Sequence, residues 1–426
     1  MAPSFRSNKR LGQEETALLL KSSRKCLANL LELSTREGSR YTWDLESDEA
    51  SVSVYRVRRS KKLASKWSNM FTKAAPAPAE PIMYCAVTQV SGSLEEVVDL
   101  FHGNMNDSSE MKSLHKQLHP HLLDMQVLKT LEAPTEYNPM HSVQLLWQAY
   151  SMAPSALFRP RDFCLLQAQD EFVSSTGRRG WARSLQSFAS PAYPSLEVPH
   201  GGYVRGSIYG SGHLFTESAT PGCIDVVAVM CMDPKSNMPS WTQCMNIKRH
   251  VNNLHVLHDI LHDRRMNAEG FLGDLDLVPK ASVASCYVCR KAFHLLSRKI
   301  HCRKCGVVVC SKCTQERNAT LDKQGHTKLD VCIVCCDTAK YRPSTSGASD
   351  RGSVQSGIKA RFSNLRSPMQ SPVGSSPSST TMSSLSSQRS DNRFAKTPTR
   401  PSSARSQQAT YFGMNPKHGT RVVLVH

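Results

Sequence analysis

The 426-residue sequence has no long apolar run. Its longest core-like stretch is "IDVVAVMCM", which begins at residue 224 and is far too short to cross a bilayer as a helix. The N-terminus, "MAPSFRSNKRLGQEE", contains no apolar h-region, so we expect no secretory signal. These absences predict a cytoplasmic protein that approaches membranes from their surface.

Acidic residues are scarce relative to basic ones. The chain has 53 Lys and Arg against 35 Asp and Glu, a formal net charge of +18. Such an excess favours an anionic partner, either a nucleic acid or a phospholipid surface. The segment 340–426 is basic, rich in Ser and Pro and poor in large apolar residues. We therefore expect 340–426 to be a disordered tail, because it cannot bury enough apolar surface to offset its ordering entropy.

Recognisable catalytic motifs are absent as well. The sequence contains no GxSxG elbow, no P-loop, no HExxH and no protein-kinase motif set. The glycine-rich "GSIYGSG" (206–212) falls in a predicted hairpin, where it is not placed to cradle a phosphate. The sixteen histidines are dispersed, and "HPH" (119–121) is expected in a loop. We therefore expect a protein without enzymatic activity.

Periodicity predicts a mixed α+β domain before residue 265. Helical spacing of leucines predicts a helix over 14–33, and alternation predicts strands over 50–59 and 82–90. Short apolar runs separated by turn signals from 142 to 232 predict an antiparallel sheet. One long amphipathic helix is predicted over 245–263, and it must bury its apolar face, most simply against that sheet.

Cysteines concentrate in one short region. Of the fifteen in the chain, eight form four CxxC pairs: Cys286/Cys289, Cys302/Cys305, Cys310/Cys313 and Cys332/Cys335. A CxxC turn directs two thiolates at one ion, and four sulfurs in a tetrahedral array suit Zn²⁺. Eight sulfurs therefore predict two closed Cys₄ sites, which are structural rather than catalytic. Because the module is too small for a large core, the metal is expected to supply most of its folding free energy.

The spacing "CYVC…F…SRKIHCRKCGVVVCSKC…DVCIVC" resembles a FYVE-type zinc finger, a module associated with phosphatidylinositol 3-phosphate on endosomes. The resemblance covers about residues 284–338 and implies that the pairs interleave. One zinc ion would be held by Cys286, Cys289, Cys310 and Cys313, and the other by Cys302, Cys305, Cys332 and Cys335.

The resemblance also assigns membrane-facing residues. Leu295 and Leu296 occupy the loop that enters the bilayer in such fingers, and the alternative is that they pack inside the module. The residues expected to contact a lipid headgroup are Arg298, Lys299, His301 and Arg303; the alternative for these four is a solvated basic face. Together, the two leucines and the basic side chains would form a reversible membrane anchor, to which each set contributes weakly.

The headgroup signature departs from the family in three places. Ile300 stands where the family has its first histidine, and Lys280 stands near the aspartate of a Trp-x-x-Asp motif that this chain lacks. Asp330 replaces the usual arginine before the last CxxC pair. Each change removes a contact to phosphate, and Asp330 adds repulsion. We therefore expect weakened or lost specificity for 3-phosphoinositides.

The N-terminal domain resembles the START lipid-transfer domain. The resemblance rests on "RPRDFCLLQ" (159–167), "HGGYVRGSIYGSGHLF" (200–215) and "IDVVAVMCMDPKSNMPSW" (224–241). It implies a helix-grip fold, an antiparallel sheet that curls round its last helix and encloses one lipid or sterol. The alternative is a collapsed domain that serves in protein contacts. Arg161 and Asp162 are expected to form a structural salt bridge at the start of a strand; the alternative is that they face the ligand.

The predicted organisation is a START-like domain (12–265), a linker (266–283), a FYVE-related two-zinc cross-brace finger (284–338) and a disordered tail (340–426). The predicted function is that of a peripheral lipid-binding adaptor on endosomal or other acidic membranes. No nucleic acid is expected as a partner. The alternatives are a RING-like ubiquitin ligase and a zinc-dependent scaffold that binds nucleic acid or protein.

Overall fold

The computed structural model describes residues 11–34, 41–49, 51–59, 82–102, 108–196, 202–235, 238–321, 325–340 and 423–424. All of these belong to one compact unit. Apart from the two-residue strand β16 (Val423–Leu424), the predicted tail from residue 341 onward lies outside the described residues. Among the helices of the described residues, none is both long and apolar enough to span a bilayer.

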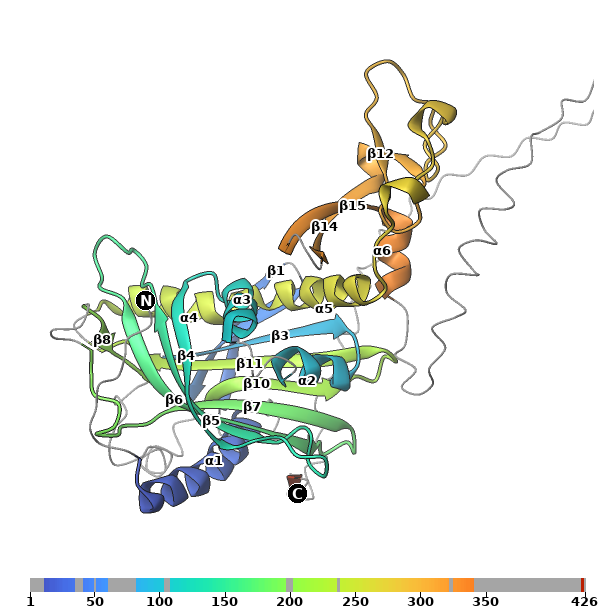
Figure 1. Cartoon of the computed structure of the whole chain (residues 1–426). Helices are drawn as coiled ribbons and strands as arrows, with labels where there is room; N and C mark the ends of the chain where they lie inside the picture. Colours follow the sequence, from blue (N-terminus) through green and yellow to red (C-terminus); the bar gives the residue numbers. More distant parts are fainter. Residues whose placement is uncertain are drawn as a thin grey trace, which may run out of the picture. The chain divides into compact units, whose positions relative to one another are not determined.

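A curved antiparallel sheet forms the N-terminal domain (Figure 1). Along the sheet the strands follow the order β1-β2-β3-β11-β10-β7-β6-β5-β4. Their bounds are β1 (Tyr41–Glu49), β2 (Val52–Arg59), β3 (Met83–Ser91), β4 (Leu122–Glu132), β5 (Ser142–Tyr150), β6 (Arg161–Val173), β7 (Arg179–Ser187), β10 (Ser211–Glu217) and β11 (Cys223–Asp233). The short strands β8 (Val204–Arg205) and β9 (Ser207–Ile208) pair with β6 and β11. The predicted antiparallel sheet is thus confirmed and is larger than 142–232.

Helices cover both faces of this sheet (Figure 1). Helix α1 (Gln13–Ser34) packs its buried leucines Leu27, Leu30 and Leu31 on β6, β7 and β10. The close approach of α1 depends on Gly212 of β10, whose φ is +148°. A Cβ atom there would lie 2.8 Å from the side chain of Leu30 and 2.0 Å from the backbone oxygen of Arg183.

The opposite face carries α2 (Leu94–His102), α3 (Ser108–Leu118), α4 (Ser240–Val251) and α5 (His255–Ala268). Helix α2 begins with a capping box in which Ser93 Oγ accepts the Glu96 amide at 3.2 Å and Glu96 Oε2 accepts the Ser93 amide at 2.9 Å. The single helix predicted over 245–263 is wrong in one respect. A 3₁₀ turn (Asn252–Leu254) with non-helical Asn253 divides it into α4 and α5.

The cysteine-rich module consists of two small hairpins and a short helix. The first hairpin pairs β12 (Lys299–His301) with β13 (Val308–Cys310), and the second pairs β14 (Thr314–Leu321) with β15 (Gly325–Cys332). Helix α6 (Ile333–Lys340) follows directly. A small core of valines and cysteines joins these elements, and Met266 of α5 belongs to the same core.

The predicted linker is in contact with this module. Helix α5 continues to Ala268, and two 3₁₀ turns (Asp274–Asp276 and Lys280–Ser282) follow it. The amide of Leu272 donates to the oxygen of Arg303 at 2.8 Å, and the amide of Val278 donates to the oxygen of Gly306 at 3.0 Å. These bonds hold the segment 269–283 against the turn that carries the second CxxC pair.

Candidate functional site

The eight paired cysteines come together in two groups of four. One group contains Cys286, Cys289, Cys310 and Cys313, and the other contains Cys302, Cys305, Cys332 and Cys335. Within each group the sulfur atoms all lie within 4.8 Å of one another. The first and third pairs therefore share one site, and the second and fourth share the other, which is the interleaved arrangement that the family resemblance implies.

The sulfur geometry fits tetrahedral zinc. The Cys289 and Cys310 sulfurs are 3.8 Å apart, and the Cys305 and Cys332 sulfurs are 3.9 Å apart. Four sulfurs at about 2.3 Å from a central ion lie about 3.8 Å from each other. These distances are far longer than a disulfide bond of about 2.05 Å. Two structural zinc ions are the cofactors of this module, and they would be held by these eight thiolates.

Backbone amides support the thiolate form of the ligands. The Cys310 amide donates to the Cys286 sulfur at 3.3 Å, and the Cys332 amide donates to the Cys302 sulfur at 3.2 Å. Burial opposes ionisation of Cys286, but the backbone donors outweigh it and lower the pKa of this thiol to about 6. Cys336 belongs to neither group and is fully buried in the module's core.

Leu295 and Leu296 protrude from the loop before β12. Their side chains are 106% and 100% exposed, so they do not pack inside the finger. The loop tip is held by two bonds between His294 and Ser297: the Ser297 amide donates to the His294 oxygen at 2.8 Å, and the His294 amide donates to Ser297 Oγ at 3.0 Å. A short ordered turn thus presents two apolar side chains to the solvent, an arrangement typical of an interaction surface.

A pocket of about 290 Å³ lies between β12, β15 and the segment 269–283. It brings together the four predicted headgroup residues Arg298, Lys299, His301 and Arg303. Lys280 and Lys328 add two further cations to the same wall. The lining thus contains five Lys and Arg side chains against two carboxylates, those of Asp274 and Asp330, which makes it suited to an anion.

Three of the four predicted headgroup residues already have partners in the protein. Lys299 Nζ donates to the backbone oxygens of Lys280 (2.9 Å) and Val283 (2.7 Å). His301 Nε2 lies 2.8 Å from the Val278 oxygen, and Arg303 Nη1 lies 2.5 Å from Asp274 Oδ1. Arg298 is exposed. The segment 269–283 therefore competes with any ligand for the cations of the pocket.

The three departures from the family pattern all lie in this pocket. Ile300 is 8% exposed and pairs with Val309 in the first hairpin, so it supplies packing where a histidine ring would supply a donor. Lys280 places an ammonium group near the missing aspartate, and Asp330 places a carboxylate in the lining. The pocket thus keeps a cationic excess while its pattern of donors differs from that of the family.

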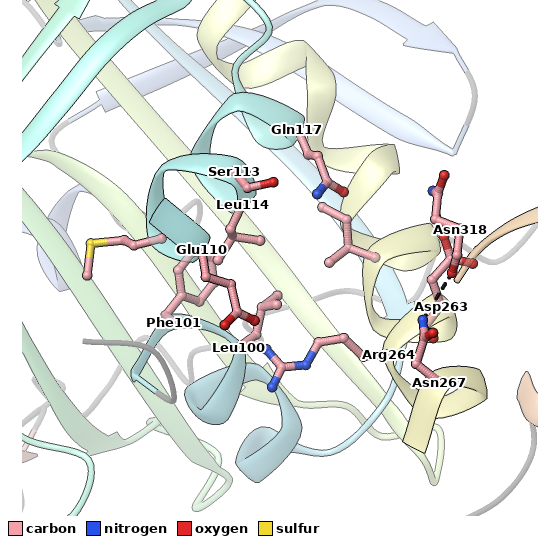
Figure 2. Close-up of a pocket in the computed structure, with 12 residues that line it drawn as sticks. Leu100, Phe101, Glu110, Ser113, Leu114, Gln117, Asp263, Arg264, Asn267 and Asn318 are labelled. Carbon is pink, nitrogen blue, oxygen red and sulfur yellow. Dashed lines mark hydrogen bonds between the residues drawn. The ribbon is translucent and has the colours of Figure 1, made fainter. Parts of the chain in front are cut away.

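A second pocket, of about 120 Å³, lies between α2, α3 and α5 of the N-terminal domain, and Asn318 of β14 also lines it (Figure 2). Leu100 and Phe101 of α2, Met111 and Leu114 of α3 and Ile260 of α5 give it an apolar lining. Its rim is polar and includes Glu110, Gln117, Asp263, Arg264, Asn267 and Asn318. An apolar hollow with a polar rim is the kind of surface that accepts part of a hydrophobic ligand.

A cluster of buried polar side chains lies next to Phe101, and sequence reasoning did not predict it. Arg183 of β7 is 2% exposed, and its guanidinium carbon lies 5.0 Å from the centre of the Phe101 ring. Arg183 Nε donates to Gln167 Oε1 at 2.9 Å, and Nη2 lies 2.7 Å from His115 Nε2. Burial lowers the pKa of Arg183 to about 10, so the guanidinium remains a cation at neutral pH.

Five histidines surround this arginine or adjoin it. They are His115 on α3, His119 and His121 after it, His213 on β10 and His250 on α4, and all are at most 7% exposed. Burial lowers the pKa of His119 to about 4 and that of His121 to about 3. The expectation that "HPH" lies between elements is correct. The histidines are dispersed along the sequence, but the fold gathers five of them.

Arg161 and Asp162 do not form the expected salt bridge with each other. Asp162 Oδ2 accepts bonds from Arg205 Nη2 (2.8 Å) and Trp147 Nε1 (3.0 Å). Arg161 Nε instead donates to the Pro234 oxygen at 2.7 Å. Consecutive residues of a strand point to opposite faces, so each finds its own partner. Both roles are nonetheless structural, as expected.

Comparison with known families matches two segments of the chain. The model of the START domain matches residues 86–253, and the model of the FYVE zinc finger matches residues 276–341. The first covers most of the curved sheet together with α4, and the second covers both groups of cysteines. These two families are lipid-binding domains rather than catalytic ones.

Several curated proteins are similar over a short segment. Protein FREE1 of Arabidopsis thaliana is 36% identical over 69 residues, 16% of this chain and 12% of its own length. Human pleckstrin homology domain-containing family F member 2 is 39% identical over 61 residues, 14% of this chain and 24% of its own. The 1-phosphatidylinositol 3-phosphate 5-kinase FAB1 of Saccharomyces cerevisiae is 35% identical over 75 residues, 17% of this chain and 3% of its own. The chain thus spans less than a quarter of the length of each.

Two solved structures are similar in the N-terminal domain. Human StAR-related lipid transfer protein 5 matches 58% of this chain and 97% of its own, at 17% identity and a TM-score of 0.41. Human STARD10 matches 63% of this chain and 88% of its own, at 14% identity and a TM-score of 0.36. From the two family matches and the two groups of cysteines, the chain carries a START domain followed by a FYVE-type zinc finger.

Proposed function

We propose that this protein is a peripheral membrane adaptor without enzymatic activity. Its finger docks on acidic membranes that contain phosphoinositides, and its START domain binds a hydrophobic lipid. The proposed organisation is a START domain over 12–265, a linker over 266–283, a finger over 284–338 and a tail over 340–426. Endosomal membranes are the proposed location, because FAB1 is named for phosphatidylinositol 3-phosphate and is similar to this chain over 75 residues.

The observation that carries the proposal is the pair of fully exposed leucines next to a cationic pocket. Leu295 and Leu296 precede Arg298 by three and two residues, and Arg298 lines the pocket. Burying one leucine in the bilayer contributes about 1.5–3 kcal/mol. Each nearby cation adds about 1 kcal/mol on an anionic leaflet. Two leucines and a few cations together give a membrane affinity that is useful and reversible.

The composition of the pocket supports binding of acidic lipid with weak discrimination for the 3-phosphate. Asp330 repels phosphate, and Asp274 holds Arg303 at 2.5 Å. Ile300 offers no donor, whereas Lys280 and Lys328 add charge without a fixed geometry. The pocket therefore favours acidic lipids in general and discriminates weakly between phosphoinositides that differ in the position of the phosphate.

Flotation of the full-length protein on liposomes tests the membrane part of the proposal. With phosphatidylcholine vesicles containing an acidic lipid, we expect the wild type to float and the double variant Leu295→Ser/Leu296→Ser to stay in solution. Leu18→Ser is the matched control, because Leu18 is a 60% exposed leucine on α1, far from the finger in the sequence. Equal flotation of the double variant and the control would show that Leu295 and Leu296 do not insert into the membrane.

The same preparation separates the rival functions. A gel shift with DNA tests the nucleic-acid alternative, and tight DNA binding without flotation would replace the membrane function. A ubiquitin-transfer assay tests the RING alternative. The metal sites do not favour the RING alternative, because all eight ligands are cysteines in CxxC pairs, whereas RING sites usually include a ligand histidine.

A further inference from the structure

The interior of the START domain holds a positive charge, that of Arg183, which forms no ion pair with a carboxylate of the described residues. Arg183 contacts Gln167, His115 and the ring of Phe101. Among the described residues no Asp or Glu forms an ion pair with Arg183, although the strand neighbour Arg179 pairs with three glutamates at the surface. A charge removed from water is costly unless a counter-charge or a set of strong hydrogen bonds accompanies it.

Hydrogen bonding shows that His115 is a neutral partner. Its Nδ1 lies 2.9 Å from the Met111 oxygen, which can only accept, so Nδ1 carries the proton. Its Nε2 lies 2.7 Å from Arg183 Nη2, which can only donate, so Nε2 accepts. The contact therefore satisfies a donor of the guanidinium without neutralising its charge.

Two further histidines in the cluster have ring nitrogens without a partner. His119 Nδ1 and His213 Nδ1 are buried and form no hydrogen bond with the described residues. The two ring centres are 6.4 Å apart, and the His119 ring lies 5.7 Å from that of His250. A neutral imidazole can carry its proton on Nδ1, so both nitrogens are able to donate to an oxygen atom.

The cluster adjoins the pocket between α2, α3 and α5. Phe101 lines that pocket (Figure 2) and also contacts Arg183, the ring of His115, whose centre lies 6.4 Å away, and the rings of Trp181 and Phe215. Met111 and Leu114 of the pocket wall are on the same helix as His115. Phe101 thus contacts both the apolar hollow and the buried cation.

We propose that this cluster is the recognition site for the acidic group of an amphiphile, with Arg183 as counter-charge and His119 and His213 as hydrogen-bond donors. The ligand class is a lipid with a phosphate or carboxylate group and an apolar tail that extends past Phe101 into the pocket. This inference rests on the proposed lipid binding and specifies its ligand. The five histidines appear in none of the candidate metal groups of the described residues.

Lipid capture by the full-length protein tests the inference. The protein is incubated with phosphatidylcholine vesicles that contain equal amounts of dioleoylphosphatidic acid and dioleoylglycerol, two lipids that differ only in the phosphate. It is then re-isolated, and its bound lipid is measured by native mass spectrometry. The variants are Arg183→Gln, Arg183→Lys and the matched control Arg179→Gln, which removes a guanidinium from the surface of the same strand. A parallel arm measures the melting temperature in inorganic phosphate.

We expect wild type and Arg179→Gln to retain phosphatidic acid over dioleoylglycerol by at least tenfold. Arg183→Gln should lose this preference and still melt cooperatively, and Arg183→Lys should recover part of it. If phosphate alone stabilises the wild type but not Arg183→Gln, the same cluster takes a free anion, and the tail is not needed. Equal capture of both lipids by wild type and Arg183→Gln would overturn the inference while leaving lipid binding intact. Capture of no lipid at all would instead refute the proposed function.

Discussion

Lys304 Nζ lies 2.6 Å from the carbonyl oxygen of Met266, so a cation of the finger's basic motif binds the last turn of α5 instead of facing a lipid. The same ammonium donates to the Gly270 oxygen at 2.7 Å. Its side chain is only 9% exposed. Cations at a helix C-terminus satisfy free carbonyl groups and complement the helix dipole. The finger and the final START helix are therefore joined by buried polar contacts.

Replacing Lys304 with methionine should loosen this junction. The change leaves the Met266 and Gly270 oxygens without their donor, which costs about 1–3 kcal/mol. Hydrogen exchange should become faster at the end of α5 and in the segment after it, with little change in the central strands. Lys312→Met is the control, because Lys312 is exposed on the same finger. Identical exchange in the two variants would contradict a role for Lys304 at the junction.

Cysteine substitutions should distinguish ligands from neighbours. Cys302→Ser removes one of four sulfurs from the second group, so we expect the bound zinc to fall from two equivalents to about one. Cys336→Ser changes a buried cysteine next to a ligand and should retain both ions. Elemental analysis of the purified proteins gives the count. A wild-type protein that contains fewer than two equivalents of zinc would contradict the assignment of the two groups of cysteines as zinc sites.

Asp330 is expected to limit affinity for phosphoinositides. Asp330→Arg replaces a carboxylate of the pocket with the cation typical of the family, a change of two charges. At about 1 kcal/mol for each charge near an anionic surface, affinity for vesicles containing phosphatidylinositol 3-phosphate should rise at least tenfold. Asp337→Arg makes the same charge change on α6, outside the pocket lining, and should have a smaller effect. Vesicle titration that ranks the two variants equally would contradict the pocket assignment.

The buried histidines predict loss of stability in mild acid. Burial lowers the pKa of His119, His121 and their three neighbours below the unfolded value of about 6.5. The unfolded chain therefore binds more protons, so stability is complete above pH 6.5 and declines as the pH falls toward 4. Each histidine contributes about 1.4 kcal/mol per pH unit in this window. His141 has the opposite sign, because hydrogen bonding to Asp170 raises its pKa.

Urea unfolding of His119→Gln between about pH 5 and pH 7 checks this pH dependence. We expect its free energy of unfolding to fall less steeply with acidification than that of the wild type. His255→Gln is the control, because His255 is exposed on α5. Its slope should match the wild type. If the free energy of unfolding depended on pH with the same slope in all three proteins, the buried ring of His119 would be protonated as easily as an exposed one.

The metal sites could be predicted from the sequence because their signal is local. A CxxC pair is readable wherever it occurs, and the interleaving of Cys286 with Cys310 followed from family resemblance. The exposure of Leu295 and Leu296 was likewise an expectation of that resemblance. In contrast, the partners of Arg303 and Lys304 lie on a segment read only as a linker, so their engagement by Asp274 and Met266 was not foreseen.

The histidine cluster could not be predicted, because its members are distant in sequence. His115 and His250 lie 135 positions apart, on two helices that only the folded chain brings together. β1 was missed because "YTWDLESDE" alternates weakly and is mostly exposed. α3 was missed because "SSEMKSLHKQL" is largely polar. In the helix predicted over 245–263, periodicity gave the buried face correctly but not the interruption at Asn253.

Helix α5 contributes to two cores within fourteen residues. Leu257 and Leu261 pack in the START core, whereas Met266 packs among the zinc-binding cysteines. A shortage of zinc would therefore affect more than the finger, because the last turn of α5 would lose the residues that cover it. Cellular zinc supply thus becomes a determinant of how firmly the C-terminal end of α5 is held.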